Sequence, residues 1–415
     1  MREMKDSRIE WIGQIPSTWR INKGKYFISL LNKPARETDE IITCFRDGEV
    51  TLRSNRREDG FTVSLTETGY QGIDVGDLIV HGMDGFAGAI GISDSRGKAT
   101  PVLNVLNTTE CKKYIMYLMR SMAYCGLFLS LSTGIRVRTC DTNWKKLREI
   151  DYLLPDLLEQ QNIANFLDAK CAESDDLTAD IQAQIDTLEQ YKRSVITEAV
   201  TKGLNPDAEM KNSGIQWIGM MPSHWDCIRG KYILKYIQKP VREDDGVITC
   251  FRDGEVTLRS NRREDGFTVA DKEIGYQGID VGDLVVHGMD GFAGAIGISD
   301  SRGKASPVLN VLDTKQNKRY IMYFLRSMAY SDVFLALATG IRVRSCDLRW
   351  NKLAELFYPV PPIEEQDAIV QHIDDVLHKV NEVIAQKKDQ LSVLEAYKKS
   401  LIFEYVTGKK EVPLA

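Results

Sequence analysis

Two long stretches of the chain carry hydrophobic residues on alternating three- and four-residue steps. This heptad spacing predicts two amphipathic helices of roughly 40 residues, each about 60 Å long, with one apolar seam. We expect the two seams to pack against each other as an antiparallel pair; the alternative is that each helix packs only on its own globular part or on another chain. The seam positions are Ala164, Leu167, Cys171, Ile181, Ile185, Leu188 and Val195, then Val370, Ile373, Leu377, Val380, Ile384, Leu391, Leu394 and Leu401.

The ends of both helices are marked by helix-terminating residues. Pro155 and the pair Pro361-Pro362 stand at or just before the starts, and Gly203 and Gly408 follow the last apolar turns. The sequence therefore predicts spacer helices over 155–203 and 359–408, a linker over 204–216, and a tail over 409–415.

The remaining stretches, 1–154 and 217–358, have the pattern of mixed α/β domains. A turn feeding an apolar strand is predicted over 72–80, a second strand over 87–93 behind a glycine-rich turn, and one internal helix over 114–131. The predicted fold class is α+β: two mixed α/β domains separated by a pair of long antiparallel coiled-coil helices.

The whole pattern occurs twice along the chain, at a constant offset of 206 residues. Such a period is too long for a solenoid repeat and indicates two domain-plus-helix modules related by pseudo-twofold symmetry. The recurring segments are Trp11–Gly13 as Trp217–Gly219, Cys44–Val63 as Cys250–Val269, His81–Ala99 as His287–Ala305, and Thr133–Arg138 as Thr339–Arg344.

The composition is that of a soluble globular protein, and the net charge of −5 is unevenly distributed. The stretch 156–200 holds ten acidic and three basic residues, and 361–410 holds nine and seven, so together they carry −9 and the rest of the chain +4. Net charge therefore does not exclude DNA as a partner. With neither a secretory signal nor a membrane span expected, we predict a cytoplasmic protein.

The sequence offers no constellation of reactive groups. Eight cysteines are scattered without metal-ligand spacing, so neither a zinc site nor a disulfide framework is expected. No nucleotide-binding, nucleophile-elbow or metalloprotease motif is found. His81 and His287 each follow an apolar strand, and no nucleophile or carboxylate pair stands near them at a spacing typical of a catalytic site. This favours a hydrogen-bonding or DNA-facing role over catalysis. We expect no catalytic residues, no metal and no cofactor.

Basic and amide side chains on loops are the strongest functional signal. Forked guanidiniums and amides are the groups that read guanine and adenine edges, and arginines alternating along a strand suit phosphates. Two alternatives remain. In one, the loop arginines are only neutralised by the adjacent Glu58 and Asp59; in the other, the alternating arginines only form the solvent-exposed face of a strand. The candidate DNA-contacting residues are Arg53, Asn55, Arg56, Arg57, His81, Arg96, Lys98, Arg136 and Arg138, and in the second copy Arg259, Asn261, Arg262, Arg263, His287, Arg302, Lys304, Arg342 and Arg344.

These features together resemble the DNA-specificity subunit of type I restriction-modification systems. The resemblance is carried by Trp11-Ile12-Gly13-Gln14-Ile15-Pro16 with Trp19, by Gly76–Val80, by Leu154-Pro155, and by Glu159-Gln160 leading into a long helix. The same motifs follow in the same order in the second copy. It implies a non-catalytic chain with two target-recognition domains, each reading one half of a split site in double-stranded DNA. It also implies docking of methyltransferase subunits, expected to be two, and of motor-nuclease subunits.

The candidate reading loops of the two copies are the same, whereas the two recognition domains usually differ in that family. Two identical recognition domains related by a twofold axis should recognise two identical half-sites on opposite strands, which together form an interrupted palindrome. The chief rival hypothesis is a coiled-coil adaptor whose globular parts bind protein; further alternatives are a specificity subunit of a related phage-defence system and a nuclease or methyltransferase.

Overall fold

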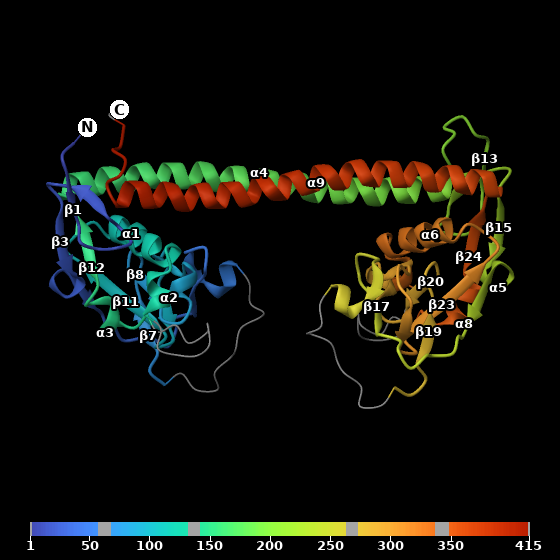
Figure 1. The fold of residues 1–415 in the computed structure, drawn as a ribbon, viewed down its shortest axis with the longest axis horizontal. Helices are drawn as coiled ribbons and strands as arrows, with labels where there is room; N and C mark the ends of the chain where they lie inside the picture. The colour runs from blue at the N-terminus through green and yellow to red at the C-terminus, as the bar shows by residue number, and fades with distance from the viewer. Residues whose placement is uncertain (1, 57–67, 132–141, 263–272, 337–347, 414–415) are drawn as a thin grey trace. The chain divides into compact units, whose positions relative to one another are not determined.

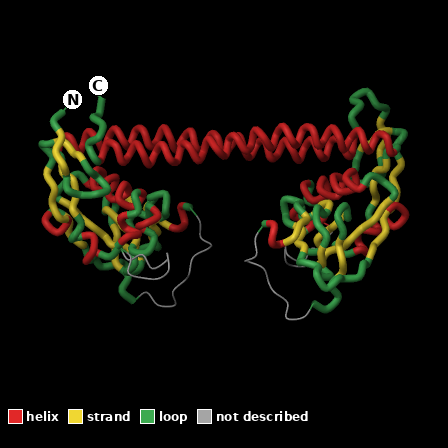
Figure 2. Tube along the Cα trace, viewed as in Figure 1, coloured by secondary structure: helices red, strands yellow, loops and turns green. Residues whose placement is uncertain are grey.

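The chain divides into two compact units, each containing one globular domain and one half of each of two long helices (Figure 1). The first unit holds Met1–Ile181 and Lys388–Ala415, and the second holds Gln182–Lys387. Both domains are mixed α/β, as the sequence predicts (Figure 2). The computed structural model describes residues 2–56, 68–131, 142–262, 273–336 and 348–413.

The domain of the first unit is built from short strands and short helices. Its helices are α1 (Lys112–Tyr124), α2 (Leu127–Ser130) and α3 (Trp144–Leu147), with single helical turns at Gly24–Tyr26, Arg53–Asn55 and Gly85–Ala87. Its strands are β1 (Met4–Asp6), β2 (Gln14–Pro16), β3 (Arg20–Lys23), β4 (Ile28–Leu30), β5 (Ile42–Cys44), β6 (Val50–Leu52), β7 (Gln71–Ile73), β8 (Leu78–His81), β9 (Ile90–Ile92), β10 (Gly97–Ala99), β11 (Leu103–Thr108) and β12 (Asp151–Leu154).

A four-stranded antiparallel sheet in the order β4, β11, β8, β9 forms the centre of this domain. Leu78 and Val80 of β8 face the larger core, which contains α1 and segments of both long helices. Ile79 faces a smaller core that includes residues of β5, β6 and β7. Because both faces of β8 are buried, its residues form the continuous apolar run that predicts a strand here.

The predicted helix over 114–131 is two helices in the structure. α1 ends at Tyr124 and α2 begins at Leu127, with Gly126 between them at φ +82°. The left-handed conformation at such a glycine ends a helix. In the second unit Asp332 occupies the equivalent break at φ 55°.

The domain of the second unit repeats this construction. Its helices are α5 (Gly230–Ile233), α6 (Lys318–Tyr330), α7 (Val333–Ala336) and α8 (Trp350–Glu355), with turns at Arg259–Asn261 and Gly291–Ala293. Its strands are β13 (Met210–Asn212), β14 (Met220–Pro222), β15 (Asp226–Arg229), β16 (Leu234–Ile237), β17 (Ile248–Cys250), β18 (Val256–Leu258), β19 (Gln277–Ile279), β20 (Leu284–His287), β21 (Ile296–Ile298), β22 (Gly303–Ala305), β23 (Leu309–Thr314) and β24 (Phe357–Val360).

One element of the second unit lies inside the range 204–216 that the sequence suggests is a linker. Strand β13 pairs with β14 in the same register in which β1 pairs with β2. Its three residues are too few to show a period-2 pattern, so only the partner strand reveals them as part of the fold.

The two long helices, α4 (Leu157–Lys202) and α9 (Ile363–Val406), run antiparallel, as predicted. Within the first unit, the start of α4 shares a core with the end of α9, and the ring centroid of Phe166 lies 4.5 Å from that of Tyr405. Within the second unit, the end of α4 shares a core with the start of α9. Among the described residues, no helix is both long and apolar enough to cross a membrane.

The Glu-Gln pair at the start of each long helix has a structural role. Gln160 is fully buried; its amide oxygen accepts from the backbone N of Cys111 at 3.0 Å, and its amide nitrogen donates to Glu110 at 2.7 Å and to Pro155 O at 3.0 Å. Gln366 makes the equivalent bonds in the second unit. This side chain therefore joins the start of the long helix to the start of the domain helix.

Candidate nucleic-acid interface

A polar depression of about 750 Å³ lies in the first unit beside the hairpin of β5 and β6; we call it the hairpin pocket. Apolar side chains and arginines both contribute to its wall. The lining residues are Ile42, Thr43, Cys44, Phe45, Arg46, Asp47, Arg53, Arg56, His81, Asp84, Thr100 and Leu103.

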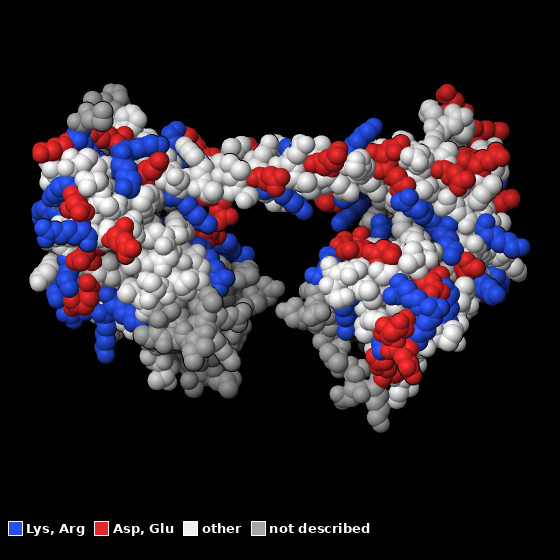
Figure 3. Space-filling view, in the orientation of Figure 1, with Lys and Arg blue, Asp and Glu red and all other residues white. Residues whose placement is uncertain are grey.

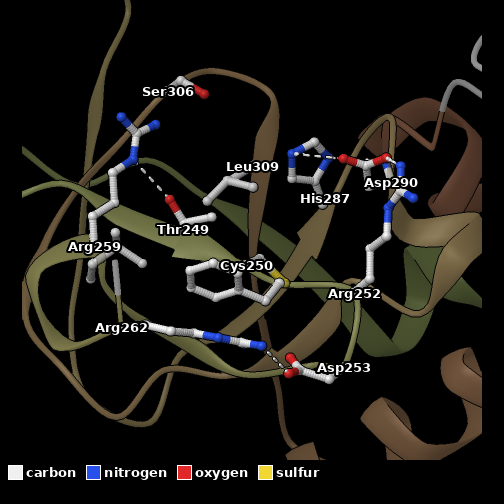
Figure 4. Close-up of a pocket in the computed structure, with 12 residues that line it drawn as sticks. Thr249, Cys250, Arg252, Asp253, Arg259, Arg262, His287, Asp290, Ser306 and Leu309 are labelled. Atoms are coloured by element: carbon white, nitrogen blue, oxygen red, sulfur yellow. Dashed lines mark hydrogen bonds and ion pairs between the residues drawn. The ribbon is translucent and has the colours of Figure 1, made fainter. Parts of the chain in front are cut away.

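The second unit has the same pocket, with a volume of about 890 Å³ (Figure 4). Each lining residue lies 206 positions after its counterpart, and Ser306 in place of Thr100 is the one difference among them. Since a hydroxyl is kept at that position, the two pockets offer the same functional groups.

Arg56, predicted to read bases, is held in the wall of the pocket. Its guanidinium lies 4.2 Å from the centroid of the Phe45 ring and forms ion pairs with Asp47 at 2.6 Å and Glu49 at 2.9 Å. The hydrogen bond to Asp47 raises the pKa of Arg56. Its side chain is 38% exposed, so an outer edge stays accessible to a ligand.

The neighbouring candidates Arg53 and Asn55 sit on the helical turn that follows β6. Arg53 donates from Nε to Thr43 Oγ1 at 3.0 Å, and Asn55 donates from Nδ2 to Thr51 Oγ1 at 2.8 Å. These bonds to threonines of the hairpin fix both side chains. Arg259 and Asn261 are fixed in the same way in the second unit.

His81 ends the buried strand β8 and faces the pocket. Its Nδ1 accepts hydrogen bonds from the backbone N of Met83 at 3.2 Å and of Asp84 at 3.0 Å. Burial lowers the pKa of His81 below that of a free histidine. The ring is therefore neutral at pH 7, with its proton on Nε2.

Several pocket residues are absent from the sequence-based candidates. Arg46 forms an ion pair with Asp84 at 2.8 Å, and Phe45 provides the surface on which Arg56 stacks. The signal that could have found them is the unbroken repetition of the segment beginning at Cys44, which includes these positions.

Arg96 does not line the pocket but belongs to a partly buried ion cluster. It pairs with Asp39 at 2.9 Å and with Asp74, while Lys33 pairs with Asp74 at 2.7 Å and Asp77 at 2.6 Å. Hydrogen bonds from Lys33 and then Arg96 lower the pKa of Asp74 to about 2. Because each group of this cluster is held by an ion pair, we infer that Arg96 braces the domain; Arg302 repeats these contacts with Asp245 and Asp280.

The other candidates lie away from the pocket or outside the described residues. Lys98 lies on β10, and its counterpart Lys304 pairs with Glu273 at 2.7 Å. The predictions for Arg57, Arg136, Arg138, Arg263, Arg342 and Arg344 fall on residues that the structure does not describe.

The described residues contain no group of three or more His, Cys, Asp or Glu side chains placed to hold a metal ion. Burial raises the pKa of Cys44, which lines the hairpin pocket, to about 12. A thiol with so high a pKa stays protonated at neutral pH and is a poor nucleophile. Cys44 therefore contributes an apolar surface to the pocket.

The fold defines the class of protein to which the chain is similar. A solved structure from work on "complex assembly and conformational transition of the type I R-M system" superposes with a TM-score of 0.67, at 12% identity, over 95% of this chain and 99% of that one. The HsdS subunit of Thermoanaerobacter tengcongensis matches at 13% identity over 95% of this chain and 98% of its own, with a TM-score of 0.47. No family model matches the chain.

A curated relative gives the same result from sequence. A protein of Methanocaldococcus jannaschii, assigned as the specificity subunit of the type I restriction enzyme MjaX, is 21% identical over 97% of this chain and 96% of its own length. The predicted resemblance to type I restriction-modification specificity subunits is thus confirmed over nearly the whole chain.

Proposed function

We propose that this chain is the DNA-specificity subunit of a type I restriction-modification complex. The observation that carries the proposal is the presence, in a chain similar to such subunits end to end, of two hairpin pockets with matching functional groups. Each pocket combines arginines, a neutral histidine and an aromatic wall, which are groups that contact base edges. Each domain would read one half of a bipartite site in double-stranded DNA.

The half-sites should be equal. Eleven of the twelve pocket positions are the same residue in both copies, and the twelfth keeps its hydroxyl. Matching pockets in the two halves of a pseudo-symmetric chain should recognise an inverted repeat in the DNA, with half-site centres about one helical turn apart.

The long helices would dock the catalytic partners. The resemblance implies methyltransferase subunits, two of them in our proposal, and motor-nuclease subunits, while this chain itself carries out no chemistry. The helices carry acidic side chains at their surface (Figure 3), and α4 has an excess of acidic residues. A negatively charged helix repels DNA phosphates, so its exposed surface suits a protein partner better than DNA.

Methylome sequencing tests the proposal. The chain is expressed with its methyltransferase partner in a host that lacks modification, and methylated adenines are mapped genome-wide. We expect methylation within a split motif whose second half is the reverse complement of the first. Unrelated half-sites would refute the symmetric reading, and absence of DNA binding even with the methyltransferase present would favour the adaptor.

A further inference from the structure

The hairpin pocket contains a hydrogen-bond donor for which the described residues offer no acceptor. In both units the Nδ1 atom of the histidine accepts from two successive backbone amides, at 3.2 and 3.0 Å for His81 and at 3.2 and 2.9 Å for His287. A ring nitrogen that accepts hydrogen bonds carries no proton, so the proton of the neutral ring is on Nε2. The backbone therefore fixes the tautomer.

The Nε2 proton points to open space in the pocket. Within the described part of the chain, no acceptor lies within hydrogen-bond distance of either Nε2; in the second unit, Asp290 Oδ2 is 3.9 Å from that atom. Figure 4 shows His287 and Arg259 on opposite sides of the pocket with Leu309 between them. A ligand lying over Leu309 would therefore lie between His287 and Arg259.

The carboxylates of the pocket are already engaged. In the first unit Asp47 pairs with Arg56 and Asp84 pairs with Arg46, and the same pairs recur in the second unit. The same pairs engage Arg46 and Arg56, so Nε2 of the histidine is the pocket donor for which the described residues offer no acceptor. A base edge that offers only acceptors complements this donor, and guanine is the base whose major-groove edge presents two acceptors, N7 and O6, without a donor.

A phosphate fits the pocket less well than a base. The three arginines of the lining are balanced by Asp47 and Asp84 together with Glu49, which pairs with Arg56, and the histidine is neutral. Phosphate sites gain their affinity from net positive charge. The apolar wall of Phe45, Cys44 and Leu103 also suits a flat heterocycle.

We propose that His81 and His287 each donate a hydrogen bond from Nε2 to N7 or O6 of a guanine, one guanine in each half of the DNA site. The inference rests on the proposed function and deepens it by naming the base and the residue that recognises it. Because the two pockets match, the two guanines occupy equivalent positions in the two half-sites.

Base analogues test the inference in the complete complex with methyltransferase. Each guanine of the mapped site is replaced in turn by 7-deazaguanine, which lacks N7, and by 6-thioguanine, in which a weak sulfur acceptor replaces O6. At one position per half-site we expect affinity to fall about tenfold with at least one analogue, the size expected for an unpaired donor. Inosine keeps both acceptors and lacks only the minor-groove amine, so it should bind as guanine does.

The variant His81→Phe/His287→Phe supplies the second arm of the experiment. It should bind guanine DNA about tenfold more weakly than the wild type and should no longer distinguish guanine from the sensitive analogue. A variant that loses affinity yet keeps the full analogue penalty would show that the histidines only support the loop.

Two outcomes separate this inference from the proposed function. A split site without a guanine at equivalent positions, or one indifferent to both analogues, would overturn the inference alone. Failure of the unmodified complex to bind any specific site would overturn the proposed function, and this inference with it.

Discussion

Replacing Gly48 and Gly254 by alanine should weaken both units more than their backbone conformation alone explains. Gly48 has φ +89° and Gly254 φ +88°, a region that costs an alanine about 1–2 kcal/mol. A Cβ atom at Gly48 would also lie 1.6 Å from Nη2 of Arg120, and one at Gly254 would lie 1.5 Å from Nη2 of Arg326. The guanidinium would have to move.

Moving Arg120 has a cost because its side chain is largely buried, at 9% exposed, and donates from Nε to Ile90 O at 2.7 Å. Losing a buried hydrogen bond from a charged group costs about 1–3 kcal/mol. The total destabilisation should therefore be about 2–5 kcal/mol per unit. The displaced turn carries Phe45 and Arg46, so specific DNA binding should fall as well.

Gly76 and Gly282 provide the matched control. Their φ angles are +84° and +85°, and a Cβ added at either meets nothing within 4 Å. The double variant Gly76→Ala/Gly282→Ala should thus lose only the backbone contribution and keep its DNA binding. Both pairs place the same change in both units, so the order in which the units unfold does not affect the comparison.

Urea unfolding followed by circular dichroism measures the midpoint for the wild type and the two double variants. We expect the midpoint of the Gly48→Ala/Gly254→Ala protein to fall roughly twice as far as that of the control. Both variants bear the cost of an alanine at positive φ, but only this one must also displace the guanidinium groups of Arg120 and Arg326. Equal shifts for the two variants would refute the reasoning, because the buried arginine would then add nothing.

Three further predictions concern the helix junction, acid stability and DNA contacts. Gln160→Ala should destabilise the first unit by about 2–4 kcal/mol because it leaves buried partners unpaired, whereas the exposed neighbour variant Gln161→Ala should change thermal stability by under about 0.5 kcal/mol. Lys33 and Arg96 lower the pKa of Asp74, and Arg96 lowers that of Asp39, so the stability that both carboxylates contribute is present near neutral pH and is lost as pH falls from about 4 to 2. Asp39→Asn should therefore flatten the dependence of melting temperature on pH in that window. Arg56→Ala/Arg262→Ala should relax base preference, while Arg136→Ala/Arg342→Ala should weaken binding to every DNA and reduce its salt dependence, as titrations at several salt concentrations would show; equal losses of affinity and specificity from both pairs would contradict this division.

The long helices and the central strand were predictable because local pattern determines them. The heptad spacing at Ile373 and Ile384 requires a helix with one buried seam, and the structure buries both residues. The run Leu78-Ile79-Val80 requires a strand buried on both faces, and these three side chains divide between two cores. By contrast, β13 and the other three-residue strands depend on partners that only the tertiary structure supplies.

The candidate site shows the same division between local and long-range information. The sequence identifies arginines as residue types able to read DNA, but it does not show which carboxylates each one meets. Arg96 finds Asp39 and Asp74, which lie 57 and 22 residues away, and this partnership places it in a brace rather than in the pocket. Arg56 pairs with Asp47, only nine positions away, yet it remains in the pocket wall because its guanidinium also stacks on the ring of Phe45.

The duplication supplies a criterion that neither composition nor spacing offers. The two copies have diverged at many positions, such as Arg20 and Asp226 or Tyr405 and Ala199, yet the hairpin pockets keep the same functional groups. Packing alone does not explain this match, because Arg46 is 64% exposed and its counterpart Arg252 is 62% exposed, and exposed side chains can be exchanged at little cost in stability. A common ligand chemistry explains it directly: two pockets that bind the same chemical group must keep the same donors, and in DNA that group would then occur once in each half-site.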